Sequence, residues 1–267
     1  MDIRLLVVSL FFLTVACQDK KGSTESIVID KKQYEIKNVF QHDLNAFTEG
    51  LFFDDAILYE STGSPESLPE TESVFGIVDL ATGKMDVKAK LDKQKYFGEG
   101  IAKANNKIFQ LTYLNKTGFV YDATTFDKID TFTFDSNEGW GLTNIDDATL
   151  VMSDGTDVLT FIDVEDLKSV KKIKVTENGL VLQNLNELEF VEGFIYANVY
   201  TQNRIVKIDI KDGSVVRSID LSGLYYDAKN KSNLILEMNG VAYNKAKKTF
   251  FITGKMWPNI YEIKILE

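Results

Sequence analysis

The sequence carries five copies of a short phrase in which a polar or aromatic residue, usually followed by glycine, precedes an aliphatic residue that opens an apolar run. The aliphatic residues of the five copies are Leu51, Ile101, Leu142, Leu188 and Val241. Their spacings are 50, 41, 46 and 53 residues. A repeat of roughly 40 to 50 residues filled with short strands is typical of a β-propeller blade. Five copies therefore predict five blades.

Each repeat continues with the strand pattern that a blade requires. Two alternating apolar runs follow the phrase, as in residues 101–103 and 108–113 around a polar turn. Such runs, rich in β-branched and aromatic residues, predict strands. In the first four repeats a third strand ends in an acidic turn that begins at Asp79, Asp122, Asp163 or Asp209. Outer strands are expected over 88–91, 130–134, 171–175 and 215–221.

The fifth repeat lacks a fourth strand. Residues 259–265 supply its third strand, and residues 34–40 precede the first repeat without belonging to any blade. Pairing these two segments would close the ring and remove exposed sheet edges. We therefore predict an all-β fold, a five-bladed β-propeller over residues 34–267 whose N-terminal strand completes the last blade.

The first residues are unlike the repeats. Residues 1–16 contain Arg4 and an apolar core, and they precede Cys17, the only cysteine. A short apolar run of this kind predicts a secretory signal rather than a spanning helix. It resembles a bacterial lipoprotein signal, which implies export, a lipid on Cys17, anchoring in the bacterial cell envelope (periplasm or outer membrane) and a polar tether over 17–33. Ordinary secretion with a leftover cysteine is the alternative, and a lone cysteine forms no disulfide within the chain.

Composition excludes several function classes. Lysine and arginine number 30 against 40 acidic residues, so the net charge of −10 argues against a nucleic-acid surface. The sequence has no Walker loop, dinucleotide fingerprint, zinc-spaced Cys/His set or Gly-x-Ser-x-Gly elbow. His42 is the single histidine, so any Ser-His-Asp triad would have to use it. It lies in a turn before the first repeat, and we expect a structural role for it.

Equivalent positions of the repeats gather chemically diverse side chains. The residues two places before the aligned aliphatic residues are Glu49, Glu99, Trp140, Asn186 and Asn239. Tyr113, Asp154 and Tyr200 stand twelve places after it, and Lys255 stands fourteen after it. Innermost strands of a propeller surround one central channel, so these side chains are expected to form a ring. Such a ring suits a small polar group flanked by apolar surface, although each residue alone has a structural reading as a turn cap.

These residues resemble a known family. The motifs in question are FTEGL (47–51), FGEGI (97–101), LTY (111–113), GWGLT (139–143), LNELE (185–189), YANVY (196–200), NGVAY (239–243) and TGKMWP (253–258). Their order is similar to that of the plant and bacterial type of glutaminyl-peptide cyclotransferase, from residue 40 to 258. The resemblance implies a five-bladed propeller that converts the N-terminal glutamine of peptides or proteins to pyroglutamate and releases ammonia, without a metal or other cofactor.

The resemblance also implies roles for particular residues. The essential glutamate falls on Glu99, which we expect to move the proton, with its pKa raised by burial. Lys255 and Asn186 are expected to donate to the carbonyl oxygen, and Glu49 to hold the substrate ammonium. The expected substrate-binding residues are Phe47, Glu49, Phe97, Tyr113, Trp140, Tyr200 and, from its ring position, Asn239.

The sequence departs from the commonest family pattern at three positions and in one stretch. Glutamate 49 replaces a frequent glutamine, Tyr113 and Tyr200 replace frequent tryptophans, and residues 64–73 replace a Gly- and Ser-rich stretch ending in arginine. Two other functions therefore stay open: a lipid-anchored peptide-binding propeller without turnover, and a calcium-dependent lactone or ester hydrolase. We expect a monomer that contacts membranes only through Cys17.

Overall fold

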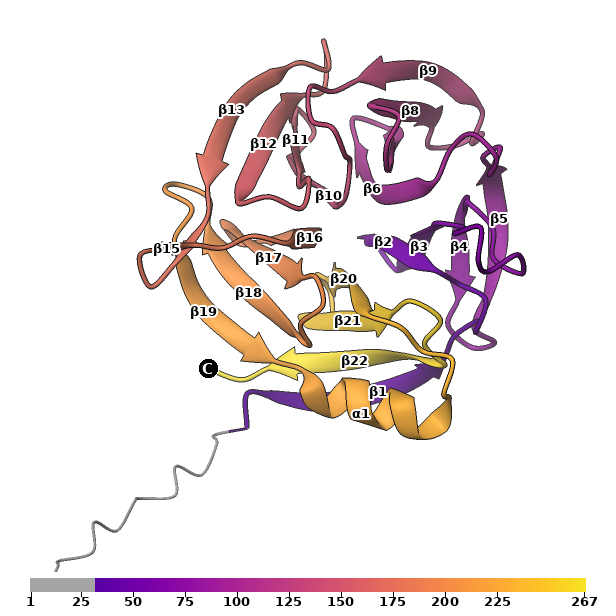
Figure 1. The fold of residues 1–267 in the computed structure, drawn as a ribbon, viewed down its shortest axis with the longest axis vertical. Helices are drawn as coiled ribbons and strands as arrows, with labels where there is room; N and C mark the ends of the chain where they lie inside the picture. The colour runs from indigo at the N-terminus through magenta and orange to yellow at the C-terminus, as the bar shows by residue number, and fades with distance from the viewer. Residues whose placement is uncertain (1–31) are drawn as a thin grey trace, which may run out of the picture. The chain divides into compact units, whose positions relative to one another are not determined.

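The structure, a computed structural model, describes residues 32–267. The expected signal segment 1–16, Cys17 and most of the expected tether 17–33 lie outside the described residues. Within the described part, five four-stranded antiparallel sheets stand around a common centre (Figure 1). This arrangement confirms the five-bladed propeller.

The first three blades follow the repeats in sequence order. Blade one consists of β2 (Thr48–Asp54), β3 (Ile57–Thr62), β4 (Val74–Asp79) and β5 (Lys84–Lys90). Blade two consists of β6 (Gly98–Ala104), β7 (Lys107–Thr112), β8 (Thr117–Asp122) and β9 (Lys128–Thr133). Blade three consists of β10 (Leu142–Asp146), β11 (Thr149–Met152), β12 (Val158–Asp163) and β13 (Ser169–Lys174). In all three blades the outer strand begins a few residues before its expected start, directly after the acidic turn.

The last two blades complete the ring. Blade four consists of β16 (Leu185–Val191), β17 (Phe194–Val199), β18 (Arg204–Asp209) and β19 (Val215–Asp220). Blade five has the order β20 (Met238–Asn244), β21 (Thr249–Gly254), β22 (Asn259–Ile265) and β1 (Tyr34–Gln41). Strand β1 pairs antiparallel with β22, from Tyr34 opposite Ile265 to Gln41 opposite Asn259. The prediction that the N-terminal strand completes the last blade is confirmed.

The same turn joins the third and outer strands in four blades. The side chains of Asp79, Asp122, Asp163 and Asp209 each accept a hydrogen bond from the backbone N–H two residues later, at 2.8 to 2.9 Å. An aspartate that bonds its own backbone in this way favours a chain reversal at its own position. The acidic turns expected from the sequence are therefore stabilised by the aspartate side chains themselves.

The core lies between neighbouring blades. The five aliphatic residues that align the repeats are 0 to 1% exposed, and each opens or lies within an innermost strand. Full burial of such a side chain contributes about 1.5 to 3 kcal/mol. The repeat is thus the packing unit of the fold, and the polar residues two places earlier are carried to the centre of the ring.

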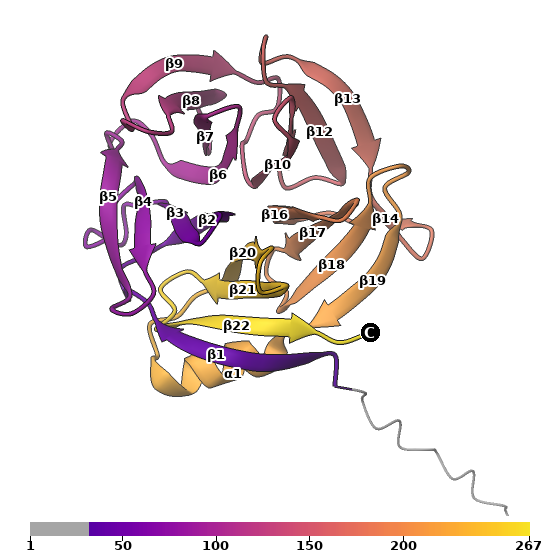
Figure 2. The same ribbon diagram turned by 180° about the vertical axis from the view of Figure 1, so that it is seen from behind.

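Two elements have no counterpart among the sequence predictions. Helix α1 (Ser222–Lys231) lies against the outer side of blade five, beside β1 and β22 (Figure 2). A small hairpin of β14 (Thr176–Glu177) and β15 (Leu180–Val181) precedes blade four. None of the helices among residues 32–267 is long and apolar enough to cross a membrane.

Candidate active site

A buried ion pair lies at the centre of the predicted site. Lys255 follows β21, and its Nζ donates to Oε1 of Glu49 on β2 at 2.8 Å. Asn239 on β20 donates through Nδ2 to the other carboxylate oxygen of Glu49 at 2.9 Å. Glu49 is 1% exposed and Lys255 7%. The ammonium that Glu49 contacts in the structure is therefore that of Lys255, whereas its expected contact with a substrate ammonium stays a prediction.

The charges of this centre act on Glu99. Glu99 lies on β6 and is 5% exposed. Burial raises its pKa well above the ordinary value, the nearby carboxylate of Glu49 raises it further, and Lys255 opposes both. Burial alone would lower the pKa of Lys255, but Glu49 and Glu99 raise it, so the lysine stays an ammonium ion. The direction of the Glu99 shift agrees with the expectation from sequence.

Aromatic side chains surround the same lysine. The Nζ of Lys255 lies 4.6 Å from the ring centroid of Phe47 and 5.4 Å from that of Tyr200. The ring of Phe47 meets Phe97 edge-on at 5.9 Å. Two further contacts extend the set, at 6.0 Å between Phe97 and Tyr113 and at 5.3 Å between Tyr200 and Trp140. The structure thus brings all five expected aromatic residues into one series of contacts around Lys255.

A close approach in blade one makes room for one of these rings. A Cβ atom added to Gly63 would stand 2.1 Å from two ring carbons of Phe97, which no packed structure tolerates. Only glycine therefore fits beside this ring. Gly63, the last residue of the Glu-Ser-Thr-Gly stretch, therefore leaves the space that the ring of Phe97 occupies.

Trp140 also lines an acidic depression. Its lining includes Ser136, Glu138, Trp140 and Asp154. The indole Nε1 of Trp140 donates to Glu138 at 2.8 Å, and Ser136 donates to Asp154 at 2.6 Å. Asp154, which the repeat alignment placed in the ring, therefore lies in this depression. Glu138 was missed by the sequence reasoning because it stands outside the aligned positions.

Several buried polar atoms of the centre have no partner among the described residues. They are Oδ1 of Asn186, Oδ1 of Asn239, Oε1 of Glu187 and Nδ2 of Asn198. Buried polar groups in proteins are nearly always hydrogen-bonded, so unsatisfied ones in a cluster suit a polar ligand or ordered water. Asn186 and Asn239 were both expected at the site. Their free amide oxygens are acceptors that an ammonium or amide group can use.

Glu187 is a central carboxyl that the sequence reasoning missed. It stands one place before Leu188, where the other four repeats have glycine. Its carboxylate accepts the backbone N–H of Leu51 at 3.0 Å and that of Val241 at 3.5 Å, which joins blade four to blades one and five. Burial raises its pKa well above the ordinary value. The break in the glycine pattern is the signal that would have found it.

Among residues 32–267 no group of three or more His, Cys, Asp or Glu side chains is placed to hold a metal ion. The polar groups gathered at the centre are amide oxygens, carboxylates and one ammonium. They suit hydrogen bonding and proton transfer to a small polar group.

Comparisons with known proteins concern the chain as a whole. A family model described as glutamine cyclotransferase matches residues 7–265. The chain is 35% identical over 261 residues to a glutaminyl-peptide cyclotransferase of Arabidopsis thaliana, covering 97% of this chain and 79% of that protein. The crystal structure of a Myxococcus xanthus glutaminyl cyclase superposes with a TM-score of 0.78 at 28% identity, covering 89% of this chain and all of that one.

Proposed function

This chain belongs to the glutamine cyclotransferase family, and we propose that it converts the N-terminal glutamine of a peptide or protein to pyroglutamate with release of ammonia. The observation that carries the proposal is the burial of Glu99 beside the Lys255–Glu49 ion pair, inside a series of aromatic rings. The centre offers a proton-transfer group, a fixed cation and apolar walls to one small planar amide.

The reaction needs little besides geometry and proton transfer. The α-amine of the first residue attacks its own side-chain amide carbon, a C–N bond forms, and the former amide nitrogen leaves as ammonia. Nucleophile and electrophile are already tethered, so the enzyme gains only by holding them in the attacking geometry. That supplies several kcal/mol of the barrier, less than the about 7 to 11 kcal/mol available when two separate reactants are brought together. The aromatic contacts around Lys255 would hold the glutamine side chain folded and exclude water.

Glu99 is the proton carrier in this proposal. It accepts the proton that the attacking amine loses and delivers it to the departing nitrogen. A carboxyl does both steps best when its pKa lies near the working pH, and burial moves the pKa of Glu99 upward in that sense. Proton transfer of this kind typically contributes about 10² to 10⁴ in rate.

Lys255 and Asn186 would stabilise the charge that grows on the carbonyl oxygen. The contacts of Glu49 suggest a second role for it. Its carboxylate would hold the ammonium group of Lys255 in place before the substrate binds. The free amide oxygens of Asn186 and Asn239 would accept from the substrate's nitrogen atoms. In this arrangement the substrate satisfies groups that have no partner among the described residues.

The experiment is incubation of the purified protein with a short Gln-initiated peptide, followed by mass measurement for the loss of one ammonia. The same peptide beginning with asparagine is the control, because its shorter side chain cannot form the five-membered lactam. Binding without loss of ammonia would favour the peptide-binding alternative. Turnover of a lactone that stops on addition of a calcium chelator would favour the hydrolase.

We also propose, from the sequence of residues 1–33, that the protein is exported and anchored in the cell envelope through a lipid on Cys17. We further propose that the anchored protein is a monomer. In a bacterial host the native chain would then partition into detergent, and Cys17→Ser would not. Equal partitioning of both proteins would contradict the anchor. Sedimentation of the Cys17→Ser variant without detergent at twice the mass of one chain would contradict the proposed monomer.

A further inference from the structure

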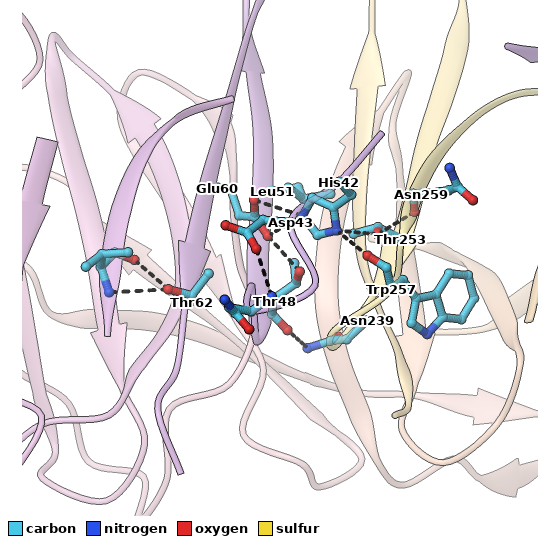
Figure 3. Close-up of polar contacts among 12 residues, drawn as sticks. His42, Asp43, Thr48, Leu51, Glu60, Thr62, Asn239, Thr253, Trp257 and Asn259 are labelled. Carbon is cyan, nitrogen blue, oxygen red and sulfur yellow. Dashed lines mark hydrogen bonds and ion pairs between the residues drawn. The ribbon is translucent and has the colours of Figure 1, made fainter. Parts of the chain in front are cut away.

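His42 lies in the segment that joins β1 to β2, and its side chain is 1% exposed. Both ring nitrogens face hydrogen-bond acceptors (Figure 3). Nδ1 is 3.0 Å from the carbonyl oxygen of Trp257, and Nε2 is 3.0 and 3.1 Å from the two carboxylate oxygens of Glu60. The hydroxyl of Thr253 also lies 3.3 Å from Nδ1, but it donates to the carbonyl of Asn259 at 2.9 Å. A carbonyl and an ionised carboxylate only accept, so with Glu60 ionised both ring nitrogens carry hydrogen. An imidazole with two N–H groups is a cation, and His42 with Glu60 forms a buried ion pair.

One arm of this pair leads to Glu49. Glu60 on β3 also accepts the hydroxyl of Thr48, at 2.6 Å. Thr48 is the first residue of β2 and directly precedes Glu49, and its carbonyl accepts Nδ2 of Asn239 at 3.2 Å. The same Nδ2 binds Glu49. Glu60 therefore fixes the strand start from which the Glu49 carboxylate projects.

The other arm leads to Lys255. Trp257 stands two residues after Lys255, and its carbonyl receives the His42 ring. The backbone N–H of His42 donates to the carbonyl of Pro258 at 3.0 Å, and that of Met256 to the carbonyl of Ala46 at 2.8 Å. The turn after Lys255 is thus tied to the β1–β2 segment at His42 and again at Ala46.

We propose that His42, as an imidazolium, is a positioning residue that holds together the two segments carrying Glu49 and Lys255, so that their ion pair keeps the geometry needed for turnover. The inference rests on the proposed function, because turnover is one of its readouts. It goes beyond the structural role expected for a lone histidine in a turn. The side chain touches neither Lys255 nor Glu49 and acts through Glu60, Thr48 and Trp257.

The charge of His42 sets a direction for pH dependence. Burial alone would lower the pKa of His42, but the carboxylate of Glu60, the hydrogen bond to Trp257 and the neighbouring Asp43 together raise it above 6.5. Glu60 and Asp43 are the charged groups that act on it. A raised histidine pKa means that the stabilisation is complete below about 6.5 and is lost as the pH rises through the folded value. The tie between the two segments should therefore loosen at alkaline pH.

The first test is nitrogen NMR of protein without an affinity tag, labelled with ¹⁵N-histidine. His42 is the only histidine, so each ring-nitrogen signal belongs to it. We expect both nitrogens to be protonated at pH 7 and to titrate above 6.5 in the full-length protein, and Glu60→Gln to lower that midpoint. A neutral ring at pH 7 would overturn the inference, whether or not the protein cyclises glutamine.

The second test compares kcat for His42→Gln with that of the unchanged protein. We expect kcat to fall about ten- to a hundredfold with a smaller change in KM, because a displacement of about 1 Å at a reacting centre costs that much. The matched control is Arg204→Gln, which breaks the Arg204–Glu177 ion pair (2.7 Å) between β18 and β14 and should leave kcat unchanged. The difference in kcat should also vanish above the measured midpoint of His42.

The outcomes separate the inference from the proposed function. An unchanged kcat in His42→Gln, with normal turnover by the parent protein, would overturn the inference alone. Absence of turnover by the parent protein would contradict the proposed function and leave the NMR result to decide the charge of His42. If His42→Gln does not fold, Glu60→Gln replaces it, since this variant keeps one acceptor oxygen for Thr48 and His42 while it removes the charge and puts an NH2 donor in place of the second oxygen.

Discussion

Lys255 is the most constrained side chain of the candidate site. It bonds Glu49, lies against the faces of Phe47 and Tyr200, and is nearly buried. Removing one partner of a buried ion pair typically costs about 3 to 5 kcal/mol, because the other charge is left uncompensated. A buried ion pair is therefore a poor source of stability, which suggests that the position of this pair serves the function of the site. Because Glu49 already holds the ammonium group of Lys255 in place, the candidate site has a cation whose position is fixed before any reaction begins.

Glu99→Gln should abolish most of the release of ammonia and leave the fold intact. Glutamine keeps the shape of the side chain but carries no exchangeable carboxyl proton, so kcat should fall about 10² to 10⁴-fold. The neutral amide also removes a buried group whose charged form is disfavoured, so the melting temperature at pH 7 should not drop. Ammonia release and thermal unfolding measure the two effects, with Glu165→Gln, an exposed carboxyl in a turn, as control. Full activity in Glu99→Gln would remove Glu99 from the mechanism.

The sequence predicted which residues lie together at the centre better than it predicted their hydrogen-bond partners. Repeat alignment found Glu49, Asn186 and Asn239 because equivalent positions of a propeller face the same centre. It could not show that Glu49 pairs with Lys255, since that contact joins residues 206 positions apart. Glu138 was invisible to alignment because it belongs to a loop rather than to a repeated strand position.

At the scale of elements, the strands were predictable and the helix was not. A strand that recurs in five blades is visible as a repeat, whereas α1 occurs once. It has no side-chain cap and only two buried residues, Leu224 and Ala228. Its helical form therefore depends on packing against blade five, including Trp257 and Tyr261. The hairpin of β14 and β15 did have a signal, because Asn178-Gly179 is a strong type I′ turn sequence and both residues have positive φ, 53° and 80°.

Leu224→Ala should destabilise the protein by about 2 to 5 kcal/mol, since Leu224 is fully buried under blade five. Tyr226→Ala is the matched control on the same helix, because Tyr226 is 62% exposed and should cost little. Urea unfolding of both variants gives the free energies. Equal losses in the two variants would mean that α1 is not packed as described.

At the scale of the whole molecule, Glu187 breaks the symmetry of the ring. Four repeats have glycine at this position, and the fourth blade alone sends a carboxyl across the centre to backbone N–H groups of blades one and five. The contact joins three blades at the centre, whereas the pairing of β1 with β22 closes blade five at the rim. Its burial makes the stability of the ring depend on pH.

Glu187→Gln should stabilise the protein more at pH 8 than at pH 5. Burial raises the folded pKa of Glu187 well above 4.5. As the pH rises past 4.5, the unfolded chain releases this proton while the folded one retains it, which costs about 1.4 kcal/mol per pH unit up to the folded pKa. Glutamine does not titrate and keeps an acceptor for the N–H of Leu51. Chemical unfolding at both pH values gives the difference, and a constant difference would contradict the raised pKa.

The closure of blade five has a consequence for chain connectivity. The N–H of Leu266 donates to the carbonyl of Gln33 at 2.9 Å, so the two edges of the described chain are neighbours in one sheet. A circular permutant that joins these edges by a short linker and opens the loop between blades two and three would preserve every strand pair. Strands β22 and β1 would then form one continuous hairpin, and blade five would be synthesised without interruption. The ring would close by contact between blades two and three, not by strand pairing between distant parts of the chain.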